Sequence, residues 1–438
     1  MIFSDYKKAV RRLEKTIQPL KKSYMDSTVQ KNGKFFLERT QRLMAKLKNP
    51  EKNFNYIHVA GTAGKGSTAT MIYEVLHAAR YNVGLHTSPH VSTTLERMQV
   101  RGKLINPQSF IWAVNKVLPL VERLKHNDPW RPSYSEIAFA VALIAFKKEH
   151  CQWLVIETSC GGRYDLTNII PAPLICILTN VSLDHTEVLG KTVTAIAWHK
   201  AGIIKKNSVI FSAETKPSVR KIFNKEAKKF HQKIHYAQPA KNFTLIMPGA
   251  HQQNNAALAE AAAKHLKIKP AMIKKGLQKA RLPARIEILQ KKPLIILDGA
   301  HDLAKILALT KTLKQFKPWG KFYLIFAAKK GKKVTELLAP LAKLVDTAYL
   351  TSFQLPGFGS IPSSQVGRVL HKINPAIKII LEPVATKALS ACLKNCRQKN
   401  ADKNPLILIT GSLYLCGKLR QSFILEQGIV EKRNCFPV

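Results

Sequence analysis

The segment 55–68, NYIHVAGTAGKGST, restricts the fold of this chain more than any other feature, because an apolar run ends abruptly at a glycine-rich turn. Residues 56–60 have the composition of a buried strand, and apolar side chains recur at helical spacing over residues 67–80. The turn is therefore expected to lie at the N-terminus of a helix, where unpaired N–H groups and the helix dipole attract an anion.

The same turn carries the residue types that a bound phosphate requires. Glycines let the backbone approach the phosphate, a lysine supplies positive charge, and a hydroxyl can face a magnesium ion. These residues are Gly61, Gly64, Gly66, Lys65, Ser67 and Thr68. The pattern G-x-x-x-x-G-K-[ST] is not met, because a glycine follows the lysine and none stands five residues before Gly64. We interpret the turn as a variant phosphate-binding loop.

The rest of the chain alternates apolar runs with helical stretches, which is typical of an α/β fold with a mostly parallel sheet. After the loop, strands are expected at 83–87, 153–158, 174–178 and 209–212. The segment LPARIEILQKK then breaks the rhythm, and a second set of strands is expected at 294–297, 323–326, 347–351, 377–381 and 406–409. We predict a large phosphate-binding domain at 1–287, a smaller Rossmann-like domain at 288–438, and a site in the cleft between them.

Length and composition exclude several classes of protein. A chain of 438 residues with 46% hydrophobic residues is typical of a globular protein with more than one domain. The longest apolar run, 137–146, is about half the length of a membrane span and is expected to be a buried helix. The first residues lack the apolar core of a signal peptide, and the seven cysteines form no C-x-x-C pair. We expect a cytoplasmic monomer with free thiols and no membrane partner.

The net charge of +43 has three interpretations. It can attract nucleic acid, it can draw an anionic small substrate into a cleft, or it can be a solvated lysine-rich surface without a partner. The lysines are spread along the whole chain, and segments such as AAKKGKK contain no aromatic residue on which a base could stack. This distribution favours the solvated surface and makes nucleic acid the least favoured of the three.

Polar residues collect just after the expected strands, where open α/β sheets bind ligands. The clusters are HTSPH, ETSCGGRYDLTN, TNVSLDHTEVLG and, before the next strand, WHKAGI. Magnesium beside a nucleotide prefers hard oxygen donors, so Ser88 and Glu157 are the expected ligands, with His185 as an additional one.

Nine motifs in one order resemble those of the folylpolyglutamate synthase and dihydrofolate synthase family, within the Mur ligase superfamily of ATP-dependent amino-acid ligases. They are AGTAGKGST, HTSPHVSTTLERMQVRGKLI, GGRYDLTN, LDHTEVLGKT, HKAGIIK, GAHQQNNAA, PARIEIL, LDGAH and TGSLYLCGKLR. The resemblance spans nearly the whole chain. It implies a large ATPase domain followed by a smaller Rossmann-like domain, which agrees with the boundary drawn above.

The resemblance also implies roles for individual residues. Phosphates of ATP would be held by Gly61, Thr62, Gly64, Lys65, Gly66, Ser67 and Thr68, and magnesium by Ser88, Glu157 and His185. Lys200 matches a lysine that the family can carbamylate to help bind a second magnesium ion. Asn255, Arg285 and Asp298 match nucleotide contacts, whereas His301 and Ser412 match positions associated with the incoming glutamate. Catalytic roles fall to Lys65, Lys200, His185 and His301.

The implied reaction joins L-glutamate to a folate-type carboxylate. The acceptor carboxylate attacks the γ-phosphate of ATP to give an acyl phosphate and ADP, and the glutamate amine then displaces phosphate. The acceptor would be tetrahydrofolate, dihydropteroate or both. Three alternatives stay open: a Mur-type ligase for another amino acid and acceptor, a basic nucleic-acid-binding ATPase, and a catalytically silent paralogue.

Several positions depart from the family pattern. Ala63 stands where the family usually has asparagine, His199 replaces a glutamate before Lys200, and Asp302 replaces an asparagine after His301. The second domain differs further at AAKKGKK and around Gly357. These departures bear more on the amino-acid side of the site than on the ATP side.

Overall fold

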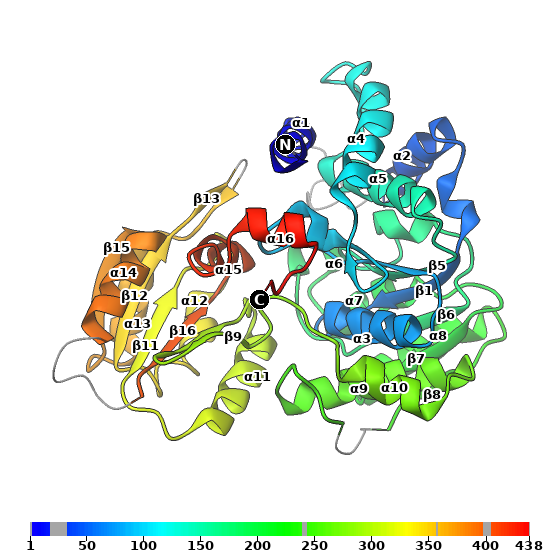
Figure 1. Ribbon diagram of the computed structural model, residues 1–438. Coiled ribbons are helices and arrows are strands. Elements are labelled where there is room, and N and C mark those ends of the chain that lie inside the picture. Colours follow the sequence, from blue (N-terminus) through cyan, green and yellow to red (C-terminus); the bar gives the residue numbers. More distant parts are fainter. Residues whose placement is uncertain (1, 18–32, 239–242, 356–357, 397–403, 438) are drawn as a thin grey trace. The chain divides into compact units, whose positions relative to one another are not determined.

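The apolar runs that the sequence predicts as strands form two separate sheets in the computed structural model (Figure 1). The structure describes residues 2–17, 33–238, 243–355, 358–396 and 404–437. Two compact units divide the chain: unit 1 comprises Met1–Ile246, His251–Arg281 and Val430–Cys435, and unit 2 comprises Met247–Ala250, Leu282–Ile429 and Phe436–Val438. In these units residues 282–287 group with the second sheet, whereas the sequence-based ranges assign them to the first domain.

Unit 1 contains an eight-stranded sheet with the order β4-β3-β2-β5-β1-β6-β7-β8. The six strands from β2 to β8 in this order run parallel, and β3 and β4 are antiparallel additions at one edge. The bounds are β1 (Asn55–Ala60), β2 (Val83–His86), β3 (Met98–Val100), β4 (Lys103–Leu104), β5 (Trp153–Glu157), β6 (Ile175–Leu178), β7 (Val209–Ser212) and β8 (Ile234–Tyr236). The central strands are buried on both faces, which explains their continuous apolar sequences.

The helices of unit 1 begin where the sequence supplies a cap. Ser133 and Glu136 form a capping box at the start of the buried helix α5, and Asn106 caps α4 ahead of Pro107. The bounds are α1 (Ile2–Glu14), α2 (Gly33–Lys46), α3 (Lys65–Ala78), α4 (Pro107–Glu122), α5 (Tyr134–Lys148), α6 (Thr186–Leu189), α7 (Val193–Ala201), α8 (Pro217–Lys228), α9 (Ala250–His265) and α10 (Pro270–Leu277). The predicted buried helix at 137–146 is confirmed as part of α5.

Unit 2 contains a six-stranded sheet with the order β15-β12-β11-β16-β10-β9, parallel except for the edge strand β9. Its strands are β9 (Glu287–Lys291), β10 (Leu294–Leu297), β11 (Phe322–Phe326), β12 (Thr347–Ser352), β15 (Lys378–Val384) and β16 (Leu406–Thr410), with β13 (Gln354–Leu355) and β14 (Phe358–Gly359) as a separate pair. Its helices are α11 (Leu303–Leu313), α12 (Val334–Leu338), α13 (Ser363–Ile373), α14 (Ala385–Cys396), α15 (Leu413–Arg420) and α16 (Glu426–Lys432), the last of which continues into unit 1.

Short 3-10 helices occur at η2 (Pro50–Asn53), η3 (Thr94–Arg97), η4 (Leu166–Ile169) and η5 (Lys314–Phe316). Each unit also contains one buried ion pair. Arg39 pairs with Glu136 in unit 1, and Arg420 pairs with Glu287 in unit 2. Removing one partner of such a pair typically costs about 3–5 kcal/mol.

Two α/β units with mostly parallel sheets confirm the predicted fold class. In the part of the chain that the structure describes, no helix has the length and apolar character needed to cross a bilayer. Position Gly357, one of the departures noted above, lies outside the described residues.

Candidate active site

The predicted phosphate loop connects the carboxyl end of β1 to the first residue of α3. Gly64 precedes the helix with φ of 84°, a left-handed conformation that glycine adopts without strain, and Lys65 is the first helical residue. The Lys65 ammonium lies over the loop, 3.5 Å from the carbonyl oxygen of Thr62. The strand, turn and helix expected from residues 55–68 are therefore present.

Hydrogen bonds to the segment after β6 hold this loop in place. The Thr62 N–H donates to the Asn180 carbonyl at 2.9 Å, and the Ala63 N–H donates to Asn180 Oδ1 at 3.3 Å. Thr179 Oγ1 donates to the Ala63 carbonyl at 2.8 Å, and the Ser182 N–H donates to Thr62 Oγ1 at 3.1 Å. At Ala63, where the family usually has asparagine, both the backbone N–H and the backbone carbonyl therefore make hydrogen bonds.

Close packing leaves no room for a side chain at two glycines of the loop. A Cβ at Gly61 would lie 1.6 Å from Thr179 Oγ1, and a Cβ at Gly64 would lie 2.3 Å from Asn255 Oδ1. Asn255 is buried on α9, and its amide donates to Gln252 Oε1 at 2.9 Å. The structure thus brings Asn255, a predicted nucleotide contact, against the loop.

The first turn of α3 fits a phosphate and its counterion. The first N–H groups of a helix lack acceptors within the helix, and α3 is long enough to carry a substantial dipole. Ser67 and Thr68 are both buried, and Thr68 Oγ1 has no hydrogen-bond partner within the described part of the chain. A buried hydroxyl without a partner is costly in a purely structural role, so the turn suits an additional polar ligand.

Two of the three predicted magnesium ligands meet at the ends of neighbouring strands. Glu157 is the last residue of β5, and its Oε2 accepts the Ser88 N–H at 3.2 Å just after β2. His185 precedes α6 with φ of 49°; its Nε2 lies 3.7 Å from Asp184 and its Nδ1 3.8 Å from Glu187. Carboxylate and hydroxyl oxygens are donors that magnesium prefers, so the Ser88 and Glu157 pair fits the ion.

Lys200 on α7 also reaches the phosphate loop. The residue is 3% exposed, and its ammonium donates to the Gly61 carbonyl at 2.7 Å. The preceding residue, His199, packs its ring edge-on against Trp198 and Tyr164. Burial, together with the positive charges of Arg163 and Lys200, lowers the pKa of His199 to about 4, so this imidazole is neutral at pH 7.

Asp165 and His58 organise the loop after β5, and sequence reasoning missed both. Asp165 Oδ2 accepts the Cys160 N–H at 2.6 Å and Oδ1 accepts the Thr167 N–H at 3.0 Å. Thr167 Oγ1 in turn lies 2.9 Å from Nε2 of the fully buried His58. The motif GGRYDLTN contained the signal for Asp165, but nothing in the sequence connects His58 to it.

In unit 2, Asp298 and Arg285 lie around the start of the loop after β10. Asp298 Oδ2 accepts the Ile286 N–H at 2.9 Å, and Oδ1 accepts the Ala300 N–H at 2.8 Å. Burial raises the pKa of Asp298, and the charge of Arg285 opposes that shift. A Cβ on Gly299 would lie 3.2 Å from Arg285 Nη1, so the Arg285 side chain lies beside the loop that begins at Asp298.

The two residues matched to glutamate binding also have defined partners. His301 Nδ1 lies 2.7 Å from the Gly299 carbonyl, so this nitrogen carries the proton, and Nε2 accepts from the Lys305 ammonium at 3.1 Å. Lys305 pairs with Asp302 at 2.5 Å, and Asp302 caps α11. Ser412 caps α15 by accepting the Tyr414 N–H at 3.2 Å.

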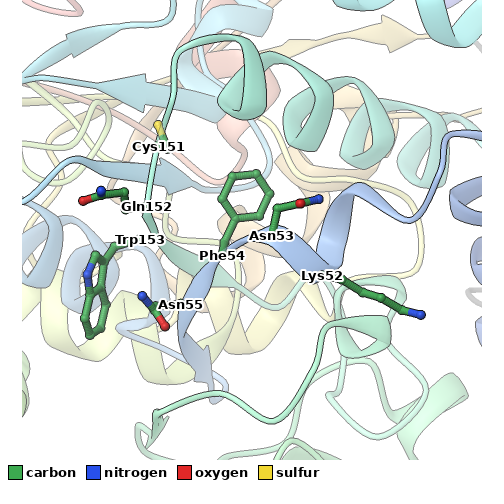
Figure 2. Close-up of a pocket in the computed structure, with 7 residues that line it drawn as sticks. All are labelled: Lys52, Asn53, Phe54, Asn55, Cys151, Gln152 and Trp153. Carbon is green, nitrogen blue, oxygen red and sulfur yellow. The ribbon is translucent and has the colours of Figure 1, made fainter.

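One pocket lies away from these residues (Figure 2). It is lined at the amino ends of β1 and β5 by Lys52, Asn53, Phe54, Asn55, Cys151, Gln152 and Trp153. Because β1 and β5 are parallel, their amino ends lie together, and the phosphate loop lies at the other, carboxyl end of β1. This pocket therefore does not belong to the candidate active site.

Comparison with known proteins identifies the family. Residues 59–257 match the Mur ligase middle domain, and residues 284–422 match the Dihydrofolate synthetase C-terminal domain. The Dihydrofolate synthase/folylpolyglutamate synthase of Bacillus subtilis (strain 168) is 32% identical over 420 residues, which cover 88% of this chain and 94% of the relative. The Folylpolyglutamate synthase of Lacticaseibacillus casei is 31% identical with the same coverage.

A solved structure agrees with these sequence matches. The folylpolyglutamate synthase of Mycobacterium tuberculosis, complexed with ADP and AMPPCP, aligns with a TM-score of 0.81 at 25% identity, covering 89% of this chain and 96% of that one. The order of motifs, the phosphate loop and the two α/β units all agree with this similarity. The chain therefore belongs to the folylpolyglutamate synthase/dihydrofolate synthase family of ATP-dependent ligases.

Proposed function

We propose that this chain joins L-glutamate to a folate-type carboxylate at the expense of ATP, releasing ADP and phosphate. The observation that carries the proposal is the phosphate loop held between Asn180, Asn255 and Lys200, with Ser88 and Glu157 at the adjacent strand ends. Family membership supplies the class of substrates. The acceptor is tetrahydrofolate, dihydropteroate or both.

The residues of unit 1 account for activation of the acceptor. Lys65 and the N–H groups of the first turn of α3 bind the ATP phosphates. The hydrogen bonds to Asn180 fix the orientation of the peptide groups in the loop. A magnesium ion held by Ser88, Glu157 and His185 would offset the charge of the phosphates. Such positioning and charge stabilisation is most of what phosphoryl transfer to a carboxylate requires.

Lys200 acts at the same loop from α7. Its donation to the Gly61 carbonyl positions the turn just before the phosphate-binding residues. Carbamylation of Lys200 and a second magnesium ion stay predictions. His199 contributes a neutral ring to the packing around α7, because its pKa lies well below neutrality.

Unit 2 supplies the residues that we assign to the nucleotide and to the amino acid. Arg285 and Asp298 are assigned to the nucleotide, and His301 and Ser412 to glutamate. The Lys305 ammonium, which pairs with Asp302, donates to His301 Nε2 and so fixes the orientation of the imidazole that we assign to glutamate. Exclusion of water protects the acyl phosphate until the amine attacks.

We further propose that the enzyme works as a monomer in the cytoplasm on small-molecule substrates. All seven cysteines are free and buried, which suits a reducing compartment. Size measurement of the purified chain by light scattering tests the monomer.

Product mass spectrometry tests the function directly. The purified chain is incubated with ATP, magnesium, L-glutamate and either dihydropteroate or tetrahydrofolate, and ADP formation is measured in parallel. We expect a mass increase of one glutamate residue on at least one acceptor, with ADP formation that depends on the acceptor. If neither acceptor gains mass while another acceptor and amino-acid pair releases phosphate, the chain is a Mur-type ligase of different specificity.

A lysine variant tests the assignment of the loop. Lys65→Ala should reduce turnover to background while the circular dichroism spectrum and the melting temperature stay close to those of the wild type. Lys206→Ala, which removes an exposed lysine outside the loop, is the matched control and should keep full activity. Full activity of Lys65→Ala would remove the loop from the mechanism.

A further inference from the structure

The surface formed by α8 and by the segment that leads into β8 combines exposed lysines with an exposed phenylalanine. We call it the α8–β8 surface, and it comprises Lys221, Lys225 and Lys228 of α8 together with residues 229–236. Its sequence from Lys228 is KKFHQKIHY. Both elements belong to unit 1, where β8 is the last strand of the sheet, next to β7 (Figure 1).

Helix α8 has an apolar side and an opposite side with three lysines. Val219, Phe223 and Ala227 recur at four-residue spacing and pack into the core against strands β6 and β7. Lys221, Lys225 and Lys228 lie on the opposite side and are exposed. Among the described residues these three lysines have no carboxylate partner, so their charges face solvent uncompensated.

Two buried carboxylates lie close by in the sequence; Glu226 pairs with Lys229 of the α8–β8 surface, but neither is paired with Lys221, Lys225 or Lys228. Glu226 is 4% exposed and pairs with Arg163 at 2.5 Å and with Lys229 at 2.7 Å. Glu214 is 1% exposed and accepts the Val181 N–H at 2.7 Å. Both acidic groups are therefore directed inward, and the outer side of α8 presents only positive charge.

Aromatic rings lie beside these lysines. Phe230 is 36% exposed at the end of α8, although a phenylalanine without a partner is normally buried. The Arg220 guanidinium lies over the ring of Tyr236 on β8, 4.2 Å from the ring centroid. Strand β8 is three residues long and pairs with β7, and among the described strands it is the last of its sheet.

We propose that the α8–β8 surface binds single-stranded nucleic acid. The lysines of α8 contact successive phosphates, and a base stacks on Phe230. Alternating positive charge and exposed rings is the combination by which proteins bind single strands without reading their sequence. Charge alone would suit any polyanion, but an exposed ring between lysines favours a partner that has both phosphates and planar bases. The segment KKFHQKIHY places aromatic residues among lysines, a combination that segments such as AAKKGKK lack.

Fluorescence anisotropy of the full-length chain with labelled oligouridylate and oligothymidylate of equal length tests the proposal. The titration is repeated over a range of salt concentrations with saturating ATP and magnesium present, so that the phosphate loop is occupied. The variant K221E/K225E/K228E should bind more weakly, and the slope of log affinity against log salt should fall in magnitude by about 2. The control K372E/K387E/K394E makes the same change in net charge on exposed lysines of unit 2.

The control separates a local surface from overall charge. If both triple variants lose affinity equally, the binding follows from net charge alone and the α8–β8 surface has no special role. Binding that disappears when ATP saturates the enzyme belongs to the phosphate loop and likewise overturns the proposal. Equal affinity for the two oligonucleotides supports recognition of features that RNA and DNA share, whereas a strict requirement for a double strand contradicts it.

A second variant tests the stacking. Phe230→Ala should weaken binding at least about fivefold while leaving the salt slope unchanged, because the lost contact is uncharged. Phe230→Tyr should retain the affinity. All variants should keep wild-type ligase activity, which shows that they fold. Unchanged affinity in Phe230→Ala would remove the base contact and with it the assignment to nucleic acid.

Discussion

At Gly64 of the phosphate loop, both the backbone conformation and the close packing favour a residue without a side chain. Its φ of 84° is costly for any residue with a side chain, and its Cα faces the amide of Asn255 so closely that a methyl group would overlap Oδ1 at 2.3 Å. Gly64→Ala should therefore lose stability and also move Asn255 or the loop. We expect at least tenfold weaker ATP binding, of the order of ~1.4 kcal/mol, measured by isothermal titration calorimetry.

Gly331 provides the matched control for this prediction. Its φ is 87°, and a Cβ at this position would have no atom within 4 Å among the described residues. Gly331→Ala isolates the cost of a left-handed alanine, about 1–2 kcal/mol, which should appear in denaturant unfolding without any change in ATP affinity. If Gly64→Ala and Gly331→Ala lose equal stability and bind ATP equally well, close packing against Asn255 has no functional consequence.

The residues that we propose to act on substrates have a local sequence signal, whereas residues that hold the backbone of another loop have none. Lys65, Ser88 and Glu157 lie at or just after the ends of apolar strands and have side chains that suit phosphate or magnesium. Asn180 works instead by accepting N–H groups from the phosphate loop, which comes from another part of the chain. Nothing in a local pattern specifies which loop a carbonyl or carboxylate oxygen will meet after folding.

At the scale of elements, the packing of α3 on α10 depends on a glycine. Gly276 of α10 faces the backbone of α3, and a Cβ there would lie 2.4 Å from the Val75 Cα. Backbone atoms cannot move aside as a flexible side chain can, so Gly276→Ala must separate the two helices. We expect a loss of about 1–3 kcal/mol in the free energy of unfolding, measured by urea titration.

Gly428 is the helical glycine against which this effect can be judged. It lies within α16, and a Cβ there would have no neighbour within 4 Å in the described structure. Because alanine favours helix over glycine, Gly428→Ala should stabilise the protein by up to about 1 kcal/mol. Opposite signs for the two substitutions would assign the loss at Gly276 to helix packing, and a stabilised Gly276→Ala would contradict it.

Helix α3 also makes the stability of the protein depend on pH, through the carboxyl group of Glu74. Burial raises the pKa of Glu74 to about 7, opposed by the charge of Lys279. The folded state therefore holds the Glu74 proton more tightly than the unfolded state does. Protonation of Glu74 thus contributes to the free energy of unfolding. This contribution is complete below the unfolded pKa of about 4.5 and is lost as pH rises through about 7. Glu74→Gln should match the wild type near pH 4.5 and exceed it at pH 8 by at most about 3 kcal/mol. A constant difference between the two proteins across this range, in urea unfolding, would contradict the assignment.

Elements differed in how far the sequence could predict them. The buried parallel strands β1, β2, β5, β6 and β7 were predicted to within one residue at each end, because both faces are apolar and the runs are continuous. The strands that were missed, including β3, β8 and β9, are short or lie at sheet edges, where one face meets solvent. In β9 charged and apolar residues are mixed, which is typical of a break between domains, although the strand pairs with β10.

At the scale of the whole molecule, the net charge of +43 must affect stability. Like charges repel more strongly in the folded state, where they are held closer together than in the unfolded chain. Salt screens this repulsion, since the Debye length falls from about 10 Å at ~0.1 M to about 3 Å at ~1 M. We expect the melting temperature to rise with sodium chloride concentration. The rise should be smaller in K372E/K387E/K394E, which carries less positive charge, and an equal rise in both proteins would indicate a salt effect other than screening.

The same field should act on catalysis in the opposite direction. Under the proposed function both ATP and the folate acceptor are anions, and a positive protein raises their rate of encounter until salt screens the attraction. Salt should therefore lower kcat/KM for the acceptor while kcat at saturation changes little. Because each added γ-glutamyl unit contributes one more carboxylate, the decrease should be steeper for an acceptor with a longer glutamate tail. Steady-state kinetics with acceptors of two tail lengths, over the salt range in which melting temperature rises, measures both slopes. Equal slopes would mean that the charge does not steer the acceptor, and the excess of lysine would then serve the folded protein in some way unrelated to its substrate.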